Sequence, residues 1–238
     1  MAHQQFGRII AIGDIHGCAH ALDAIVEQIQ FNSDDLLVCL GDFVDQGRNT
    51  KEVIDTLLWL SKQCRLVTLS GNHEEMLLNA LEGGQAKDTW EMFGGIATIN
   101  SYKFGGDINA IPQQHIEFIR QCVDFFQTED YIFVHANYIE NEPAENWPSY
   151  VLRWSLLEDP LPGPHQSGKT VIVGHTEQRD GEIRDLGHVI CIDTACCNYG
   201  WLTALDLRSG QCWQASKFGQ LRESTQEPRM PRLQPVTV

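Results

Sequence analysis

Short apolar runs recur along this chain of 238 residues, and each ends at a residue that can bind a metal. The runs are rich in β-branched residues and short enough to be buried strands. They are Ile9 to Ile12, Leu36 to Leu40, Leu66 to Leu69, Tyr131 to Val134 and Val171 to Val173. The pattern predicts five strands, each followed by a polar loop.

Helical spacing separates the first three runs. Leu22, Ile25, Val26 and Ile29 recur at intervals of three and four residues, which places them on one face of an amphipathic helix. Residues 53–58 and 76–81 repeat this spacing after the second and third runs. Three strand–helix units in a row predict an α/β fold with right-handed crossovers.

The rest of the chain predicts additions to these units. From residue 83 to residue 127 the spacing is helical without strands, and Ile116, Ile119, Val123 and Phe126 form its clearest stripe. We therefore expect a helical insert near 83–127, with the Gly94-Gly95 doublet at a turn that borders the cleft.

The last third of the chain predicts a second sheet. The proline-rich segment 140–166 is expected to form an ordered loop beside the site, and residues 189–192, 202–207 and 211–214 are expected to be strands. We expect one catalytic domain over residues 1–215 and a polar tail over 216–238, loosely held or packed over the surface.

The composition of the chain disfavours some classes of binding partner. Lys and Arg total 17 against 32 Asp and Glu, and the net charge of −15 disfavours broad binding to nucleic acid or to an anionic membrane. No run of eighteen apolar residues occurs, so we expect a cytoplasmic protein with no membrane partner. The eight cysteines, most of them inside apolar runs, are expected to be reduced core thiols.

The polar residues at the strand ends predict a metal centre. Taken singly, an Asp after a strand can be a helix cap and a Gly-Asn pair can be a turn. Together they bring hard oxygen ligands and imidazoles to one edge of a sheet, where α/β folds bind ligands. The predicted ligands are Asp14, His16, Asp42, Asn72, His135 and His175. This set suits two divalent ions that clamp a phosphoryl group.

The ordered motifs resemble those of a known family. The blocks are Gly13 to Gly17, Gly41 to Gly47, Gly71 to Glu74, His135-Ala136 and Gly174 to Thr176. They resemble the metallophosphoesterase superfamily, in particular its phosphoprotein phosphatase branch, which includes bacterial serine/threonine protein phosphatases and the bacteriophage lambda phosphatase. The resemblance implies the metallophosphoesterase fold: two packed mixed β-sheets flanked by α-helices.

The resemblance also implies roles for the site residues. Asp14, His16 and Asp42 would hold one metal, and Asp42 would bridge to a second metal held by Asn72, His135 and His175. His73 would be the general acid and Asp45 its carboxylate partner, while a two-metal-activated hydroxide attacks phosphorus. The implied cofactors are two divalent ions, Mn²⁺ first, with Fe or Zn as alternatives.

The phosphate-binding side departs from the family pattern. Where the second block usually carries an arginine, this chain has Gln46, which cannot make a charge-assisted fork to phosphate. Arg48 is a candidate replacement, although an ordinary surface arginine is the favoured explanation. Arg153 is the candidate for the family's other phosphate-binding arginine. Asp193-Thr194-Ala195 resembles an Asp-Thr-Gly block and is expected to shape the site.

These features predict a metal-dependent phosphomonoester hydrolase, in particular a serine/threonine protein phosphatase whose substrate is a phosphorylated protein or another phosphate ester. Because Gln46 replaces a positive charge, a diadenosine tetraphosphate hydrolase or a phosphodiesterase is an alternative within the same chemistry. A non-catalytic scaffold that binds a phospho-ligand is an alternative from another class, but such a scaffold has no evident need for His73 and Asp45.

Overall fold

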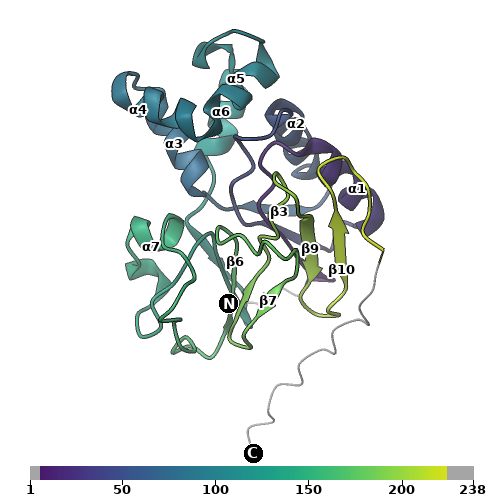
Figure 1. Cartoon of the computed structure of the whole chain (residues 1–238). Helices are drawn as coiled ribbons and strands as arrows, with labels where there is room; N and C mark the ends of the chain where they lie inside the picture. Colours follow the sequence, from purple (N-terminus) through teal and green to yellow (C-terminus); the bar gives the residue numbers. More distant parts are fainter. Residues whose placement is uncertain (1–5, 224–238) are drawn as a thin grey trace, which may run out of the picture.

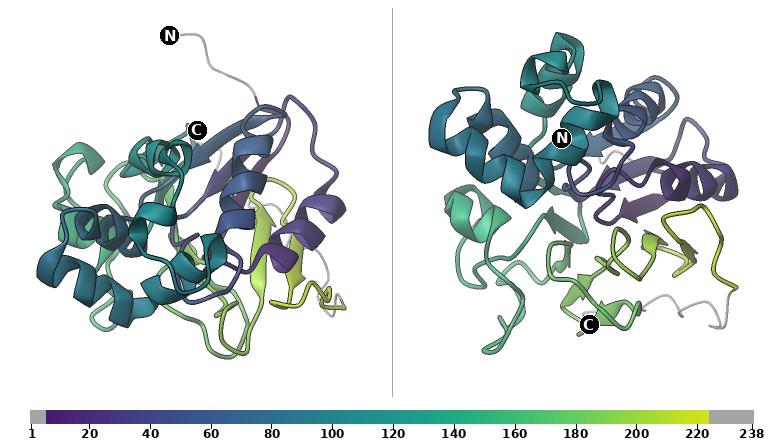
Figure 2. Two further views of the ribbon diagram at one scale, coloured as in Figure 1. Left: turned by 90° about the horizontal axis from the view of Figure 1, so that it is seen from above. Right: turned by 45° about the horizontal axis from the view of Figure 1, so that its top comes forward.

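Two five-stranded sheets pack face to face, and helices cover their outer surfaces (Figure 1). The structure is a computed structural model that describes residues 6–223. Figure 2 shows the same layers from two other directions. The predicted α/β class with two mixed sheets flanked by helices is confirmed.

The first sheet has the order β10-β9-β1-β2-β3. Its parallel strands are β1 (Ile9–Ile12), β2 (Leu36–Cys39) and β3 (Arg65–Thr68), and β9 (Leu202–Asp206) and β10 (Cys212–Ala215) add two antiparallel pairings at one side. The helices that follow the parallel strands are α1 (Ala19–Ile29), α2 (Thr50–Leu60) and α3 (Asn72–Ala80). The three predicted strand–helix units are therefore present.

The second sheet has the order β4-β5-β6-β8-β7. Its parallel centre consists of β5 (Tyr131–Val134), β6 (Thr170–Val173) and β8 (Val189–Cys191), and its antiparallel edges are β4 (Phe125–Gln127) and β7 (Arg184–Asp185). The proline-rich loop before β6 contains a 3₁₀ turn, η3 (Ala144–Asn146), and the short helix α7 (Ser149–Arg153).

Alternation of side chains along the strands builds the core. On β1, Ile9 and Ala11 face the second sheet and pack in one cluster with Phe133 and Ile172. Ile10 and its alternate neighbours face the other way, onto the helices. The strands β1 and β2 are buried on both faces, which is why their runs are apolar throughout, whereas β3 at the edge of the sheet is only partly buried.

The insert is helical as far as residue 120. It contains α4 (Gly84–Trp90), a π-helical turn η1 (Glu91–Gly95), α5 (Ile96–Tyr102), a 3₁₀ turn η2 (Ile108–Ala110) and α6 (Gln113–Arg120). Figure 1 shows α4, α5 and α6 gathered with α3 at one end of the molecule.

The predicted helical stripe through Phe126 is wrong in its last part. The Val123 N–H donates to the Thr68 carbonyl at 3.0 Å, and Val123 forms a bridge with Leu69, while Phe126 lies in β4. The reason is tertiary pairing, since these residues find backbone partners in the ends of both sheets, which local spacing does not reveal.

The described residues also bear on the cysteines and on the predicted C-terminal tail. The eight cysteines are free thiols, all of them buried or half-buried. After β10 the chain turns back, because the Ser216 N–H donates to the Gln220 carbonyl at 2.8 Å. The remainder of the predicted tail, residues 224–238, lies outside the described residues. Within the described part of the chain, no helix combines the length and apolar character that a membrane span needs.

A buried carboxylate, Asp35, anchors the start of the first sheet. It accepts hydrogen bonds from the Arg8 guanidinium at 2.6 and 3.1 Å, from the Arg8 N–H at 3.1 Å and from the Asn32 N–H at 2.8 Å. Burial would raise the pKa of Asp35, but the bonds from Arg8 and Asn32 hold it below its usual value. Asp35 therefore contributes stability only while it is ionised.

We predict that Asp35→Asn lowers the free energy of unfolding by about 1–3 kcal/mol at neutral pH, because the partly buried donors of Arg8 lose an ionised acceptor. The contribution of Asp35 is present above about pH 4 and disappears as the pH falls through its depressed folded pKa. Urea unfolding of the variant and the parent over this pH range should show a difference that shrinks in acid. Asp34→Asn, at an exposed neighbour, is the control; an equal difference at every pH would contradict the prediction.

Candidate metal centre

The carboxyl ends of strands from both sheets supply the loops of the site. The first sheet contributes the loops after β1, β2 and β3, and the second contributes those after β5, β6 and β8. Parallel strands direct these loops to the same edge. In strand order, the loops carry Asp14 and His16, Asp42 and Asp45, His135, His175, and Asp193, while Asn72 and His73 begin α3 after the loop that follows β3.

The backbone of these loops is bent into an uncommon conformation. In the described chain, seven residues other than glycine have a positive φ, and six of them lie in the loops after these strands. They are His16, Asp42, Asp45, Gln46, His175 and Ala195. Left-handed backbone costs free energy for such residues and persists only where the surrounding structure enforces it. The folded scaffold therefore holds these side chains in place at a conformational cost.

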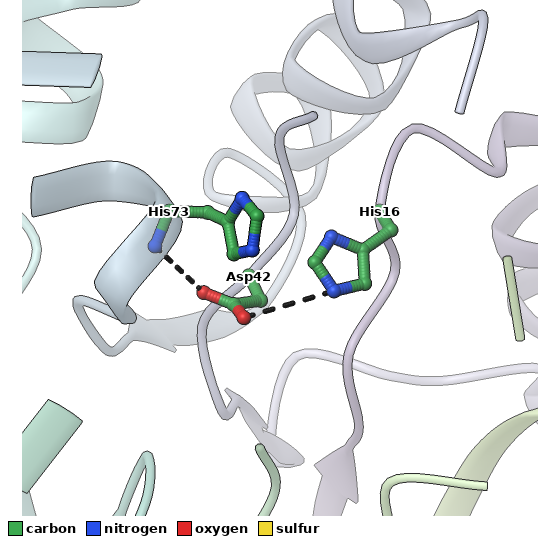
Figure 3. Close-up of side chains that lie close together, drawn as sticks. All are labelled: His16, Asp42 and His73. Atoms are coloured by element: carbon green, nitrogen blue, oxygen red, sulfur yellow. Dashed lines mark hydrogen bonds and ion pairs between the residues drawn. The ribbon is translucent and has the colours of Figure 1, made fainter. Parts of the chain in front are cut away.

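Asp42 lies at the centre of the site (Figure 3). Its Oδ2 is 3.7 Å from His16 Nε2 and 3.5 Å from His135 Nε2, and its Oδ1 accepts the His73 N–H at 3.1 Å. Two groups of potential ligand atoms share it, with members within 4.8 Å of one another: His16, Asp42 and His73, and Asp42, His135 and His175. Asp42 therefore has the position that a bridging carboxylate needs.

Carbonyl groups orient two of the imidazoles. His16 Nδ1 is 3.0 Å from the Val44 carbonyl and His135 Nδ1 is 2.8 Å from the Leu40 carbonyl. An Nδ1–H donated to a carbonyl leaves Nε2 with a free lone pair, which is how histidines are prepared for metal ligation. His175 is turned the other way, since its Nε2 is 3.2 Å from the Trp154 carbonyl. Asn72 Oδ1 lies 3.2 Å from His135 Nε2.

Asp14 carries the clearest sign that a cation fits here. Its Oδ2 accepts the His175 N–H at 3.0 Å, but its buried Oδ1 has no hydrogen-bond partner among the described residues. Burial, followed by the negative charges of Asp193 and Asp42, raises the pKa of Asp14. A buried carboxylate oxygen with no donor beside other carboxylates is costly without a positive charge. The donor set of carboxylate, amide and imidazole groups suits divalent Mn, Fe or Zn.

The neighbouring groups share this electrostatic balance. Burial would raise the pKa of Asp42, but the imidazoles of His135 and His73 hold it well below its usual value. Burial lowers the pKa of His16 and of His175 to about 4, so both are neutral and able to bind a metal at neutral pH. Burial also raises the pKa of Asp193 to about 7.

His73 forms a close pair with Asp45. Its Nδ1 is 2.9 Å from Asp45 Oδ2, and both side chains are almost fully buried. Burial would lower the pKa of His73, but the carboxylates of Asp42 and Asp45 raise it to about 9. Asp45 in turn accepts hydrogen bonds from Trp90 and Thr98 of the insert. The predicted partners His73 and Asp45 therefore lie together beside Asp42.

Glu74 is a site residue to which we assigned no role from the sequence. Its buried carboxylate accepts the N–H groups of Asp42 at 2.8 Å, Phe43 at 3.0 Å, Val44 at 3.3 Å and Gly71 at 2.9 Å. The bond to Gly71 closes a turn at the start of α3, where a Glu at the third helical position often reaches back. This spacing is a signal that could have identified Glu74.

The predicted phosphate-binding residues are arranged less simply. Gln46 is exposed, and its Nε2 lies 3.5 Å from His16 Nε2. Arg48 is exposed. Arg153 is held by two carboxylates, Glu75 at 3.3 Å from its Nη1 and Asp124 at its Nη2, while its buried Nε has no partner among the described residues. Phosphate binding by Arg153 stays a prediction, and it would require Arg153 to exchange or share these partners.

We predict that Gly174→Ala weakens metal binding. A Cβ at this position would lie 2.1 Å from Asp14 Oδ1, so the Asp14 carboxylate would have to move. Displacing a ligand in this way should weaken Mn²⁺ binding by about 10–100-fold, which calorimetric titration of the metal-free protein measures. Gly168→Ala is the control for a general loss of stability, because its φ of 74° strains alanine while a Cβ there meets nothing within 4 Å. Unchanged affinity in Gly174→Ala would argue against Asp14 as a ligand.

Comparisons with known proteins agree with this arrangement. The chain is 38% identical over 91 residues to serine/threonine-protein phosphatase 2 of Salmonella typhimurium, which covers 38% of this chain and 39% of that protein. It is 31% identical over 157 residues to a symmetrical bis(5'-nucleosyl)-tetraphosphatase of Coxiella burnetii, which covers 65% of this chain and 49% of that protein. The matched regions therefore span less than half of each of these curated relatives.

A solved structure and a family model extend the comparison to most of the chain. The structure of a proposed diadenosine tetraphosphatase superposes with a TM-score of 0.68 at 20% identity and covers 90% of this chain and 95% of that one, so it shares the fold. The family model of calcineurin-like phosphoesterases matches residues 7–204. This chain belongs to the calcineurin-like phosphoesterase family.

Proposed function

We propose that this protein is a metal-dependent phosphomonoesterase and that its substrates are phosphoserine and phosphothreonine side chains of proteins. The observation that carries the proposal is the pair of His73 and Asp45, 2.9 Å apart, at the edge of the group of candidate metal ligands. A proton donor in this position is most useful where the leaving group is a poor one, such as the alkoxide of serine or threonine.

The metal ligands are proposed as the sequence predicts them. Asp14, His16 and Asp42 would hold one ion. Asn72, His135 and His175 would hold the other, with Asp42 as the bridge. When bound, two divalent cations, Mn²⁺ in our proposal, would act as Lewis acids on the phosphoryl group and lower the pKa of a water molecule toward neutrality.

The protein's own residues would move the proton that the leaving group needs. With Nδ1 of His73 directed at Asp45, Nε2 is the nitrogen left to face a substrate. As the bond between phosphorus and the alcohol oxygen breaks, His73 would transfer its Nε2 proton to that oxygen, and the alcohol would leave neutral. Asp45 would stabilise the imidazolium before the transfer and fix the plane of the ring.

Specific observations favour a second candidate, hydrolysis of dinucleoside polyphosphates. Gln46 offers no positive charge, and Arg153 is held by Glu75 and Asp124, so few cationic side chains are free to grip a dianionic monoester. One curated relative is named as a symmetrical bis(5'-nucleosyl)-tetraphosphatase. A phosphodiesterase is a further alternative on the same ground.

A substrate panel tests the proposal. With Mn²⁺ added, we expect the highest kcat/KM on a phosphoserine peptide, measurable turnover of 4-nitrophenyl phosphate, and weaker turnover of bis(4-nitrophenyl) phosphate and diadenosine tetraphosphate. Preference for diadenosine tetraphosphate would establish the second candidate, and preference for the diester would establish a phosphodiesterase. Protein that holds its metals but turns over none of these compounds would contradict the proposal and favour a scaffold that only binds phospho-ligands.

We predict that His73→Ala lowers kcat on the phosphoserine peptide by about 10²–10⁴-fold, because the alkoxide then leaves without a proton donor. Metal content, measured by elemental analysis, should stay at the parent value. His20→Ala, at an exposed histidine on α1, should behave like the parent. Loss of an ion in His73→Ala would instead identify His73 as a ligand, which its place among the grouped ligand atoms allows.

A further inference from the structure

The helical insert supplies two hydrogen-bond donors to Asp45, the partner of His73. Trp90 Nε1 lies 3.0 Å from Asp45 Oδ1 and 2.9 Å from Oδ2, so the indole N–H bisects the carboxylate. The Thr98 hydroxyl donates to Asp45 Oδ1 at 2.7 Å. Asp45, Trp90 and Thr98 are each 0% exposed. Because His73 Nδ1 lies at Oδ2, both oxygens of this carboxylate have two hydrogen-bond partners each.

Further contacts fix the Thr98 hydroxyl itself. It accepts the Asp45 N–H at 2.9 Å and lies 3.1 Å from the Thr50 hydroxyl, which can donate to it. Because the Thr98 hydrogen is directed at Asp45 Oδ1, Thr98 binds both the backbone and the side chain of one residue. Asp45 also has a φ of 68°, and such a conformation needs support from its surroundings.

The fold of the insert brings Trp90 and Thr98 to the same carboxylate. They flank the π-helical turn Glu91–Gly95, where the helix is kinked at Phe93 and Gly94. At Gly95 a Cβ would lie 2.4 Å from the Trp90 indole, so the absence of a side chain lets the ring pack against the turn. Such π-helical turns are often found at functional sites.

Simple core packing does not account for this arrangement. A buried aromatic ring and a buried threonine could fill the same space with their polar atoms directed at backbone groups of the insert. Here both side-chain donors are directed at an acid that lies 45 and 53 residues earlier in the chain. Burial raises the pKa of Asp45, and the bonds from His73, Thr98 and Trp90 act against that rise. These bonds favour the ionised carboxylate that a protonated imidazole requires.

We propose that Trp90 and Thr98 are positioning residues that hold Asp45, and through it His73, in the orientation for proton donation to the leaving group. This inference rests on the proposed function, since it assigns a purpose to the same pair of His73 and Asp45. Without either donor, the Asp45 carboxylate can rotate away from His73 Nδ1, and the imidazole is no longer held in one plane.

Thr98→Val removes the hydroxyl with little change of shape, and Trp90→Phe removes the indole N–H while it keeps a smaller aromatic ring. We expect kcat on the phosphoserine peptide to fall by about 10–100-fold, a substantial part of a general acid's contribution. With 4-nitrophenyl phosphate, whose leaving group needs little protonation, kcat should fall less than about threefold. KM and Mn²⁺ content should stay at the parent values. Thr98→Ser, which keeps the hydroxyl, should restore most of the activity.

Ile99→Val is the matched control, because Ile99 is a buried neighbour in α5 with an aliphatic side chain that cannot bond Asp45. Equal losses on both substrates in Thr98→Val, or a loss of metal, would show a merely structural role and overturn the inference. Parent-like kinetics on the phosphoserine peptide in both donor variants would also overturn it.

A spectroscopic readout separates failure of this inference from failure of the proposed function. The His73 Nδ1–H that is bonded to Asp45 should give a strongly downfield proton resonance in the parent protein, assigned by its loss in His73→Ala. That resonance should shift or broaden in Thr98→Val and Trp90→Phe and persist in Thr98→Ser. If the parent turns over no phosphate ester but the resonance responds in this way, the proposed function fails while the positioning role stands. An unchanged resonance in both donor variants overturns the positioning role whatever the activity.

Discussion

The buried carboxylate of Glu74 is the constraint on which the site depends. It binds four backbone N–H groups, three in the loop after β2 and one at the start of α3. Those two segments carry Asp42 and the pair of His73 and Asp45, and neither is a regular strand or helix where the bonds are made. The Glu74 side chain therefore supplies the acceptors that backbone carbonyls supply in a regular helix or sheet. It does so in a loop where Asp42 and Asp45 have left-handed backbone, which needs support from its surroundings.

The carboxylates around Glu74 differ in how well their negative charges are compensated. As a result, the attraction for a cation is strongest at Asp14. Glu74 is satisfied by amides, and Asp42 is stabilised by the imidazoles of His135 and His73. Among the described residues, Asp14 has one hydrogen-bond donor, at Oδ2, and its buried Oδ1 has none. In our proposal an ion there would both serve the reaction and relieve this cost, so metal binding and folding stability would be coupled.

The sequence was sufficient for the parts of the molecule where local pattern and tertiary structure agree. The five strand-end motifs could be read because the apolar runs are largely buried and a polar stop follows each of them within a few residues. Phe126 could not be placed, since its helical spacing competes with pairing to β5 that is visible only in three dimensions. Trp90 and Thr98 carry no motif, because their role depends on a π-helical turn that returns the chain to Asp45. The sequence singled out Arg153 as a candidate phosphate-binding residue. It could not predict the contacts of Arg153 with Glu75 and Asp124, because these residues come from distant segments of the chain.

Neighbouring residues of the insert contact both Gln46 and Asp45, so the positions of these two residues depend on the same segment. The Gly94 carbonyl accepts the Gln46 N–H at 3.3 Å, and a Cβ on Gly94 would lie 2.6 Å from that nitrogen, so the π-helical turn presses on the residue that stands where the family has an arginine. Trp90 lies four residues before Gly94 and Thr98 four residues after it, and both donate hydrogen bonds to Asp45. A shift of this turn that moves Gln46 is therefore expected to disturb Asp45 as well. In our proposal, the position of Gln46 and the orientation of the proton donor His73 would both depend on this one turn, so substitutions in the insert that alter substrate choice are expected to alter leaving-group dependence as well.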